Sequence, residues 1–234
     1  STMYSLTKLN CGLPVLTAPT PGAESITVHV FAGAGSRYES RNERGISHFL
    51  EHMFFKGGKK YTSAAEVSMA IDALGGTFNA FTGKEYAGYF VKVASVHAET
   101  ACDVLSDMLL HATFPQEEAE KERGVIIEEL RMYKDTPMYQ AGWDFEELLY
   151  GDQPLGWDTI GTEETILATD QKLLQEHRAK LYTPANPVLV FAGKIEEKQA
   201  LELGERFFGE LSGAKQQAFQ PIDGRGDDRV MLTT

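Results

Sequence analysis

The spacing of apolar residues alternates along the chain between the period of a strand and that of a helix. It predicts strands at residues 4–9, 14–18, 25–31, 77–81, 86–93 and 188–192. It predicts helices at residues 46–55, 63–74, 96–112, 115–133, 137–149, 170–181 and 196–208. Hairpins followed by pairs of helices indicate an α+β fold, a mainly antiparallel sheet with helices packed on one face.

One domain is expected over residues 1–220. The 234 residues are enough to bury a substantial core, and no short-period repeat divides the chain. After Phe208 the pattern fades through glycine-containing stretches at 212–214 and 224–226. We therefore expect residues 221–234 to begin an interdomain linker.

Residues 48–52 carry the strongest chemical signal, because they read His-Phe-Leu-Glu-His within a predicted helix. Positions four apart are neighbours on a helix, so His48 and His52 can bind one metal ion together, with Glu51 on the same side. This H-x-x-E-H pattern is the inverzincin motif. Apolar residues at 46, 49, 50 and 53 indicate a buried helix, in which imidazoles and carboxylates need partners.

A third ligand is expected elsewhere in the chain, because catalytic zinc usually takes three protein ligands. The predicted helix at 115–133 is rich in glutamate, and Glu122 and Glu129 share a face because they lie two turns apart. Val125, Ile126 and Leu130 are its expected buried side. The spacing alone leaves the third ligand open among these glutamates, most of which are expected to be solvated.

Six segments in this order resemble the N-terminal half of the pitrilysin, insulin-degrading enzyme and mitochondrial processing peptidase family. They are residues 34–39 (AGSRYE), 45–57 (GISHFLEHMFFKG), 75–82 (GGTFNAFT), 122–129 (ERGVIIEE), 182–186 (YTPAN) and 188–193 (VLVFAG). The resemblance covers nearly all of the chain. It implies that the domain is one homologous half of a clamshell-shaped peptidase, with a C-terminal half or a partner subunit completing the shell.

The resemblance also implies a ligand set and a reaction. Glu129 becomes the third ligand of one Zn²⁺ per chain, beside His48 and His52, and Glu122 a second glutamate that supports catalysis. Glu51 becomes the general base of a zinc endopeptidase that cleaves extended peptides or small unfolded proteins. The expected substrate-binding strand comprises Asn79, Ala80, Phe81 and Thr82.

A non-catalytic structural subunit with the same fold is the alternative function. The intact set of His48, Glu51, His52 and Glu129 favours the peptidase, because degenerate subunits of this family usually lose part of it. We expect the isolated half to bind zinc and to need the other half for activity.

The charge and composition of the chain argue against some binding partners. The net charge of −12 argues against nucleic acid, whose phosphates require a basic surface. No apolar run is long enough for a membrane helix. Cys11 and Cys102 lack metal-like spacing and are expected to be reduced thiols, which suits a cytoplasmic protein. A homo-oligomer is a further possibility, because the surface left for the missing half is expected to be exposed.

Overall fold

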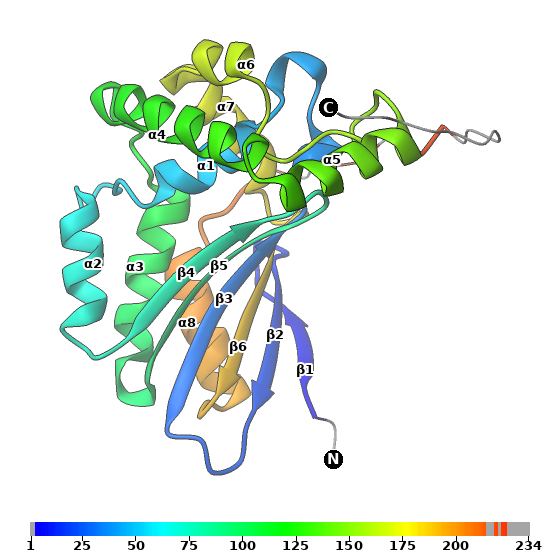
Figure 1. Ribbon diagram of the computed structural model, residues 1–234. Coiled ribbons are helices and arrows are strands. Elements are labelled where there is room, and N and C mark those ends of the chain that lie inside the picture. The colour runs from blue at the N-terminus through cyan, green and yellow to red at the C-terminus, as the bar shows by residue number, and fades with distance from the viewer. Residues whose placement is uncertain (1–2, 214–217, 220, 224–234) are drawn as a thin grey trace.

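A single mixed sheet forms the centre of the molecule (Figure 1). The computed structural model describes residues 3–213, 218–219 and 221–223. The strand order is β1-β2-β6-β3-β5-β4, and neighbours run antiparallel except β2 and β6, which are parallel. The strands are β1 (Ser5–Lys8), β2 (Pro14–Pro19), β3 (Ser25–Ala32), β4 (Thr77–Thr82), β5 (Ala87–Ala94) and β6 (Val188–Gly193).

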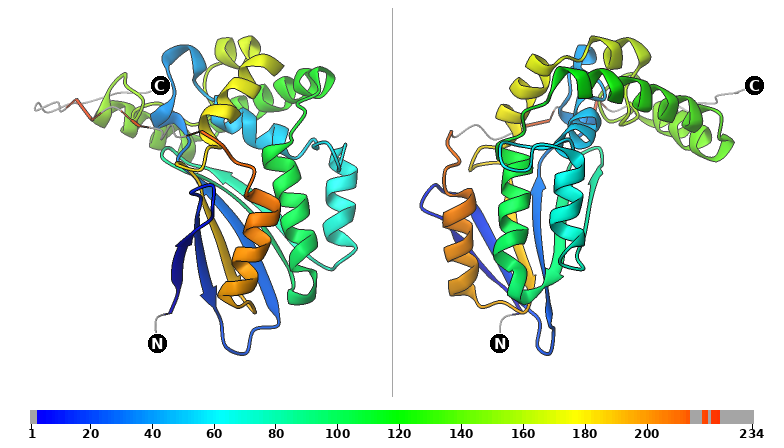
Figure 2. Two further views of the ribbon diagram at one scale, coloured as in Figure 1. Left: turned by 180° about the vertical axis from the view of Figure 1, so that it is seen from behind. Right: turned by 90° about the vertical axis from the view of Figure 1, so that its left-hand side faces the viewer.

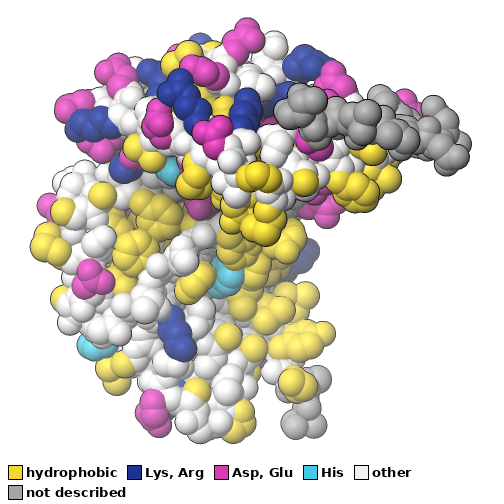
Figure 3. Space-filling model, viewed as in Figure 1, with side chains coloured by type: hydrophobic (Ala, Val, Ile, Leu, Met, Phe, Trp, Pro, Cys, Tyr) yellow, Lys and Arg dark blue, Asp and Glu magenta, His cyan; other side chains and the backbone are white. Residues whose placement is uncertain are grey.

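Three helices cover one face of this sheet, namely α2 (Ala64–Asp72), α3 (Ala98–Leu110) and α8 (Glu197–Phe208) (Figure 2). Buried and partly exposed side chains alternate along β3, and this explains why the helices cover only one face of the sheet. Ile26, Val28 and Val30 are buried, whereas His29 and Phe31 point to the other face and are only partly covered. That second face carries hydrophobic side chains at the surface of the described residues (Figure 3). The predicted α+β architecture with helices on one face is therefore confirmed.

The remaining helices gather at one end of the sheet (Figure 1). They are α1 (Ile46–Phe54), α4 (Gln116–Lys134), α5 (Pro137–Tyr150), α6 (Glu163–Ala168) and α7 (Gln171–Leu181). Helix α1 contacts α4, α7 and β4, so the H-x-x-E-H residues lie where all of these elements meet. The expected burial of α1 is confirmed, because Ile46, Phe49, Leu50 and Met53 are all almost completely inaccessible.

Some details differ from the sequence expectations. Val125 is about half exposed, so it is not part of the buried side of α4, whereas Ile126 and Leu130 are. Helix α6 was not predicted, and the helix expected from residue 96 begins with a short 3-10 turn, Ser95–His97. Most of the expected linker at 221–234 lies outside the described residues, so it stays a prediction. No helix among the described residues is long and apolar enough to span a membrane.

Candidate metal centre

Two imidazoles project from one face of α1, as their spacing predicted. The ring centroids of His48 and His52 lie 4.7 Å apart. The packing of Phe49 and Leu50 into the core fixes the rotation of the helix, and this turns both rings toward α4. The local geometry therefore follows from an apolar stripe that buries one side of a nine-residue helix.

Helix α4 brings the third donor to the same point. Glu129 Oε2 lies 3.6 Å from His48 Nε2 and 3.4 Å from His52 Nε2. One ligand atom from each of the three residues lies within 4.8 Å of the others, and no other group of this kind occurs in the described part of the chain. Two imidazole nitrogens and one carboxylate oxygen match the donor set of catalytic zinc. Such sites have three protein ligands and keep the fourth position for water or substrate.

Glu122 lies two helical turns before Glu129 on α4 and contacts this cluster. Its Oε2 lies 2.9 Å from His52 Nδ1, and its Oε1 pairs with Lys56 Nζ at 2.5 Å. A histidine that donates its Nδ1–H to a carboxylate keeps Nε2 free for a metal and has a fixed ring orientation. The geometry thus gives Glu122 a role in orienting a ligand rather than in contacting the reacting atoms.

The two imidazoles have opposite proton affinities. Burial and the neighbouring His52 lower the pKa of His48 to about 4. Burial also disfavours the charged form of His52, but hydrogen bonds to Glu122 and Glu129 outweigh it and raise the pKa of His52 to about 9. A metal that binds His52 below that pH therefore displaces a proton.

Glu51 lies on the same side of α1 and faces the end of β4. The Thr82 hydroxyl donates a hydrogen bond to Glu51 Oε2. Burial raises the pKa of Glu51, which makes its carboxylate a better proton acceptor than an exposed one. Thr82 is therefore the member of the expected substrate strand that the structure brings to the Glu51 carboxylate.

Within the described part of the chain, the other three residues of that strand form no hydrogen bond with the cluster. β4 is the last strand of the sheet, as expected for an edge that receives a peptide. Asn79 is exposed, and its Oδ1 accepts a hydrogen bond from the Ala80 amide. Ala80 packs against the core, and Phe81 lies on the open face, 5.9 Å from the ring of His29. Their substrate contacts stay predictions.

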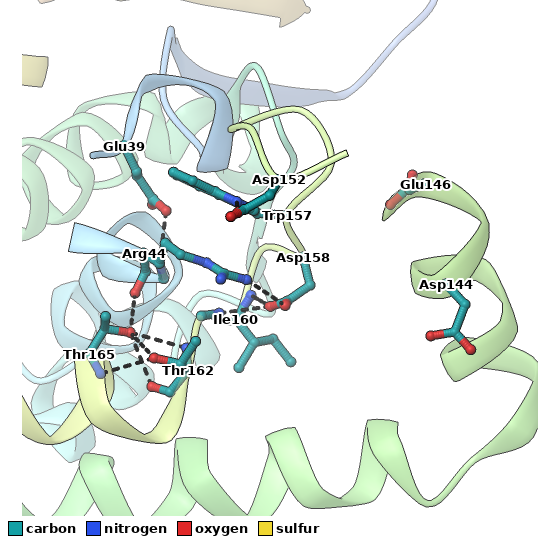
Figure 4. A network of polar contacts seen from close by, with 12 residues as sticks. Glu39, Arg44, Asp144, Glu146, Asp152, Trp157, Asp158, Ile160, Thr162 and Thr165 are labelled. Atoms are coloured by element: carbon teal, nitrogen blue, oxygen red, sulfur yellow. Dashed lines mark hydrogen bonds and ion pairs between the residues drawn. The ribbon is translucent and has the colours of Figure 1, made fainter. Parts of the chain in front are cut away.

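Contacts to α6 and the loop before it fix the approach to α1 (Figure 4). The Thr165 hydroxyl donates to the Arg44 carbonyl oxygen at 2.8 Å, and the Arg44 guanidinium pairs with Asp158 at 3.4 Å. The same guanidinium lies 4.9 Å from the ring centre of Trp157. The segment just before Ile46 is therefore held by residues more than a hundred positions away.

His177 is a buried residue of the site region that sequence reasoning missed. Its Nε2 lies 3.1 Å from the hydroxyl of Ser47, the residue directly before His48. In the sequence His177 is isolated from every other candidate ligand. Only the packing of α7 against α1 reveals the contact, so no local sequence signal could have identified it.

Burial of His177 predicts a measurable loss of stability in acid. Burial lowers its pKa to about 4, against an ordinary value of 6.5. The unfolded chain therefore binds a proton first as the pH falls, and stability is lost between about pH 6.5 and pH 4. We expect His177→Gln to reduce the fall in unfolding free energy between pH 7 and pH 5 by about 2 kcal/mol. Urea unfolding with a chelator present measures this, and equal pH dependence in both proteins contradicts it.

Comparison with known proteins identifies the family of this chain. The profile described as "Insulinase (Peptidase family M16)" matches residues 14–163, and "Peptidase M16 inactive domain" matches residues 170–230. The chain therefore belongs to peptidase family M16, the insulinase family.

Curated relatives carry names that agree with the donor set. The chain is 40% identical over 198 residues to "Uncharacterized zinc protease YmxG" of Bacillus subtilis (strain 168), covering 85% of this chain and 48% of that protein. It is 34% identical over 218 residues to an "Uncharacterized zinc protease" of Rickettsia bellii (strain RML369-C), covering 93% of this chain and 53% of that protein. The chain thus spans about half the length of the curated relatives it matches.

Solved structures share the fold. A protease from Helicobacter pylori superposes with a TM-score of 0.86 at 25% identity, covering 95% of this chain and 54% of that one. The first half of the periplasmic protease PqqL from Escherichia coli also gives 0.86, at 23% identity, covering 97% of this chain and 50% of that one. The second likeness concerns the fold alone, and this architecture accounts for about half of that solved chain.

Proposed function

We propose that this chain is the zinc-binding, catalytic half of a metalloendopeptidase. The observation that carries the proposal is the convergence of His48, His52 and Glu129 from two helices that lie far apart in the sequence. The names of the relatives support a zinc protease, and the donor set fits one Zn²⁺ per chain. Extended peptides or small unfolded proteins are the proposed substrates.

The residues around the cluster suit peptide hydrolysis. Zinc in this site supplies Lewis acidity, which activates a water and polarises the scissile carbonyl. Glu51 takes the proton from the attacking water and returns it to the leaving amine. Thr82 holds the Glu51 carboxylate in place, and Glu122 orients the His52 ring. A peptide paired with the outer edge of β4 would lie next to these groups.

A second homologous half is part of the proposal. The curated relatives are about twice as long as this chain, and the solved relatives contain a further half beyond the matched region. The donors in this chain are complete, so we propose that it binds zinc alone and cleaves peptide only with that half. A homo-oligomer and a cytoplasmic location stay predictions.

A non-catalytic subunit is the second candidate, and one finding favours it. The profile "Peptidase M16 inactive domain" matches residues 170–230. The proposed metal ligands and Glu51, however, all lie within residues 14–163, the part that matches the insulinase profile. The two candidates therefore differ over whether this complete set of donors turns over substrate.

One experiment separates these candidates. Zinc content and the cleavage of a quenched fluorescent peptide are measured for the chain alone and after addition of a separately produced second homologous half. The peptidase predicts one zinc per chain in both samples and cleavage only in the second. Stoichiometric zinc without cleavage in either sample supports the non-catalytic subunit, and absence of zinc contradicts the proposed site.

A further inference from the structure

Glu39 carries a buried carboxylate that faces the start of α1 (Figure 4). Only 4% of the residue is exposed. Its Oε2 accepts a hydrogen bond from the Gly45 amide at 2.8 Å, and its Oε1 accepts one from the Ser47 amide at 2.9 Å. Both oxygens therefore bind backbone donors at the entry to the helix that carries His48.

These two bonds replace a cap that α1 lacks. Gly45 occupies the N-cap position with φ of +84°, and no side chain of the cap residue binds the first turn. The first amides of a helix have no partner within the helix, and its N-terminus favours negative charge. Within the described part of the chain Glu39 forms no ion pair, so these amides, together with the Ser47 hydroxyl, are the partners that compensate for its burial.

The backbone at this point has little room to adjust. A Cβ atom on Gly45 would lie 2.0 Å from the Ile160 carbonyl oxygen, so the two backbones are in close contact. The Ser47 hydroxyl accepts a hydrogen bond from the Gly35 amide at 3.1 Å and contacts His177. The turn that precedes His48 is therefore located by contacts from three separate segments, and Glu39 provides two of the bonds.

The two metal-binding histidines differ in how their rings are oriented. Glu122 binds His52 Nδ1 directly, and this fixes that ring. His48 Nδ1 is buried and has no hydrogen-bond partner among the described residues. The direction of the His48 ring therefore depends on the position of its own backbone, which is the turn bound by Glu39.

We propose that Glu39 is a positioning residue for the metal centre, which fixes the first turn of α1 and through it the direction of the His48 ring. This inference rests on the proposed zinc site. Glu39 is not a metal ligand. It would orient the ring of His48, as Glu122 orients the ring of His52. Outer partners of metal ligands typically contribute 10- to 100-fold in metal affinity.

The test compares the zinc affinity of Glu39→Gln with that of the parent chain. A glutamine keeps the size of the side chain, but its amide group can accept only one of the two hydrogen bonds and opposes the other donor. Zinc dissociation constants are measured by competition with a chromogenic chelator at pH 8. Burial raises the pKa of Glu39 to about 7, so at this pH its carboxylate is mainly ionised. The spectrum of the Co²⁺-loaded chain reports the ligand geometry independently of activity.

A matched control separates positioning from general stability. Ser63→Ala removes the N-cap side chain of α2, a helix of the same nine-residue length that carries no ligand. Loss of such a cap costs about 1 kcal/mol. We expect Glu39→Gln to weaken zinc binding at least tenfold and to alter the Co²⁺ spectrum, while Ser63→Ala stays within twofold of the parent with an unchanged spectrum. Glu39→Asp, which keeps the charge but shortens the reach, replaces the glutamine variant if that one does not fold.

Each outcome decides between the claims. If the parent binds zinc and Glu39→Gln binds it equally well, or weakens it only as Ser63→Ala does, the role of Glu39 is overturned while the proposed zinc site stands. If the parent does not bind zinc, both the zinc site and this inference fail. Selective weakening by Glu39→Gln supports the inference.

Discussion

Glu51→Gln is expected to lower the turnover number for peptide cleavage by about 10³-fold in the assembly with the second half, with zinc content unchanged. Glutamine occupies the same space and can still accept the hydrogen bond from Thr82, but it cannot take a proton from the attacking water. Glu51 is not among the three donors that converge, so the metal should remain bound.

Steady-state kinetics together with metal analysis checks this result. The variant should keep a Michaelis constant close to that of the parent, because the substrate contacts at β4 are not changed. Cleavage at the parental rate with full zinc occupancy would show that another group accepts the proton. Loss of both zinc and activity would place Glu51 among the groups that hold the metal.

Glu129→Gln is expected to weaken zinc binding by at least 100-fold, the largest effect on affinity that we predict. The neutral amide is a poor zinc ligand, and only two imidazoles would remain. Glu128 provides a control that differs by one position on the same helix. Its side chain is 71% exposed and pairs with Arg131, so Glu128→Gln should leave the affinity within twofold.

Chelator competition on the isolated chain measures both dissociation constants without any need for activity. Equal affinities for the two variants would mean that α4 contributes no ligand through position 129. A large loss of zinc affinity in Glu128→Gln alone would mean that α4 is rotated by about 100° from its orientation in the structure.

The sequence was informative wherever the chemistry is local. The spacing of His48 and His52 places both rings on one face of any helix, and the apolar stripe of α1 determines which side is buried. The strand at 25–31 was predicted because polar and apolar residues alternate through residues 25–30, and the burial alternates in the same way. These features depend on one element at a time, so periodicity is enough to predict them.

The spacing of apolar residues could not predict features that join distant segments of the chain. The parallel pair β2 and β6 joins residues about 170 positions apart, and no local pattern specifies a partner strand. Val125 is apolar but faces solvent, because the buried side of α4 is made by Ile126, Leu130 and the polar Glu122. The resemblance to known peptidases, rather than spacing, selected Glu129 over its neighbour.

The supporting residues show the same limit. Glu39 and His177 lie 9 and 129 positions from His48 and belong to segments that look like ordinary loop and helix in the sequence. Their importance follows from burial beside the start of α1, and burial of a charged or titratable group is a tertiary property. Sequence alone therefore identified the donors better than it identified the residues that position them.

X-ray absorption spectroscopy of the zinc-loaded chain tests whether His48, His52 and Glu129 hold one metal ion. We expect one zinc per chain, with scattering from two imidazoles and a carboxylate oxygen at about 2.0–2.2 Å and from one further light atom. Replacing His48 with Ala should remove one imidazole from that signal. A spectrum without imidazole scattering, or zinc bound far below one equivalent, would contradict a metal centre built from His48, His52 and Glu129.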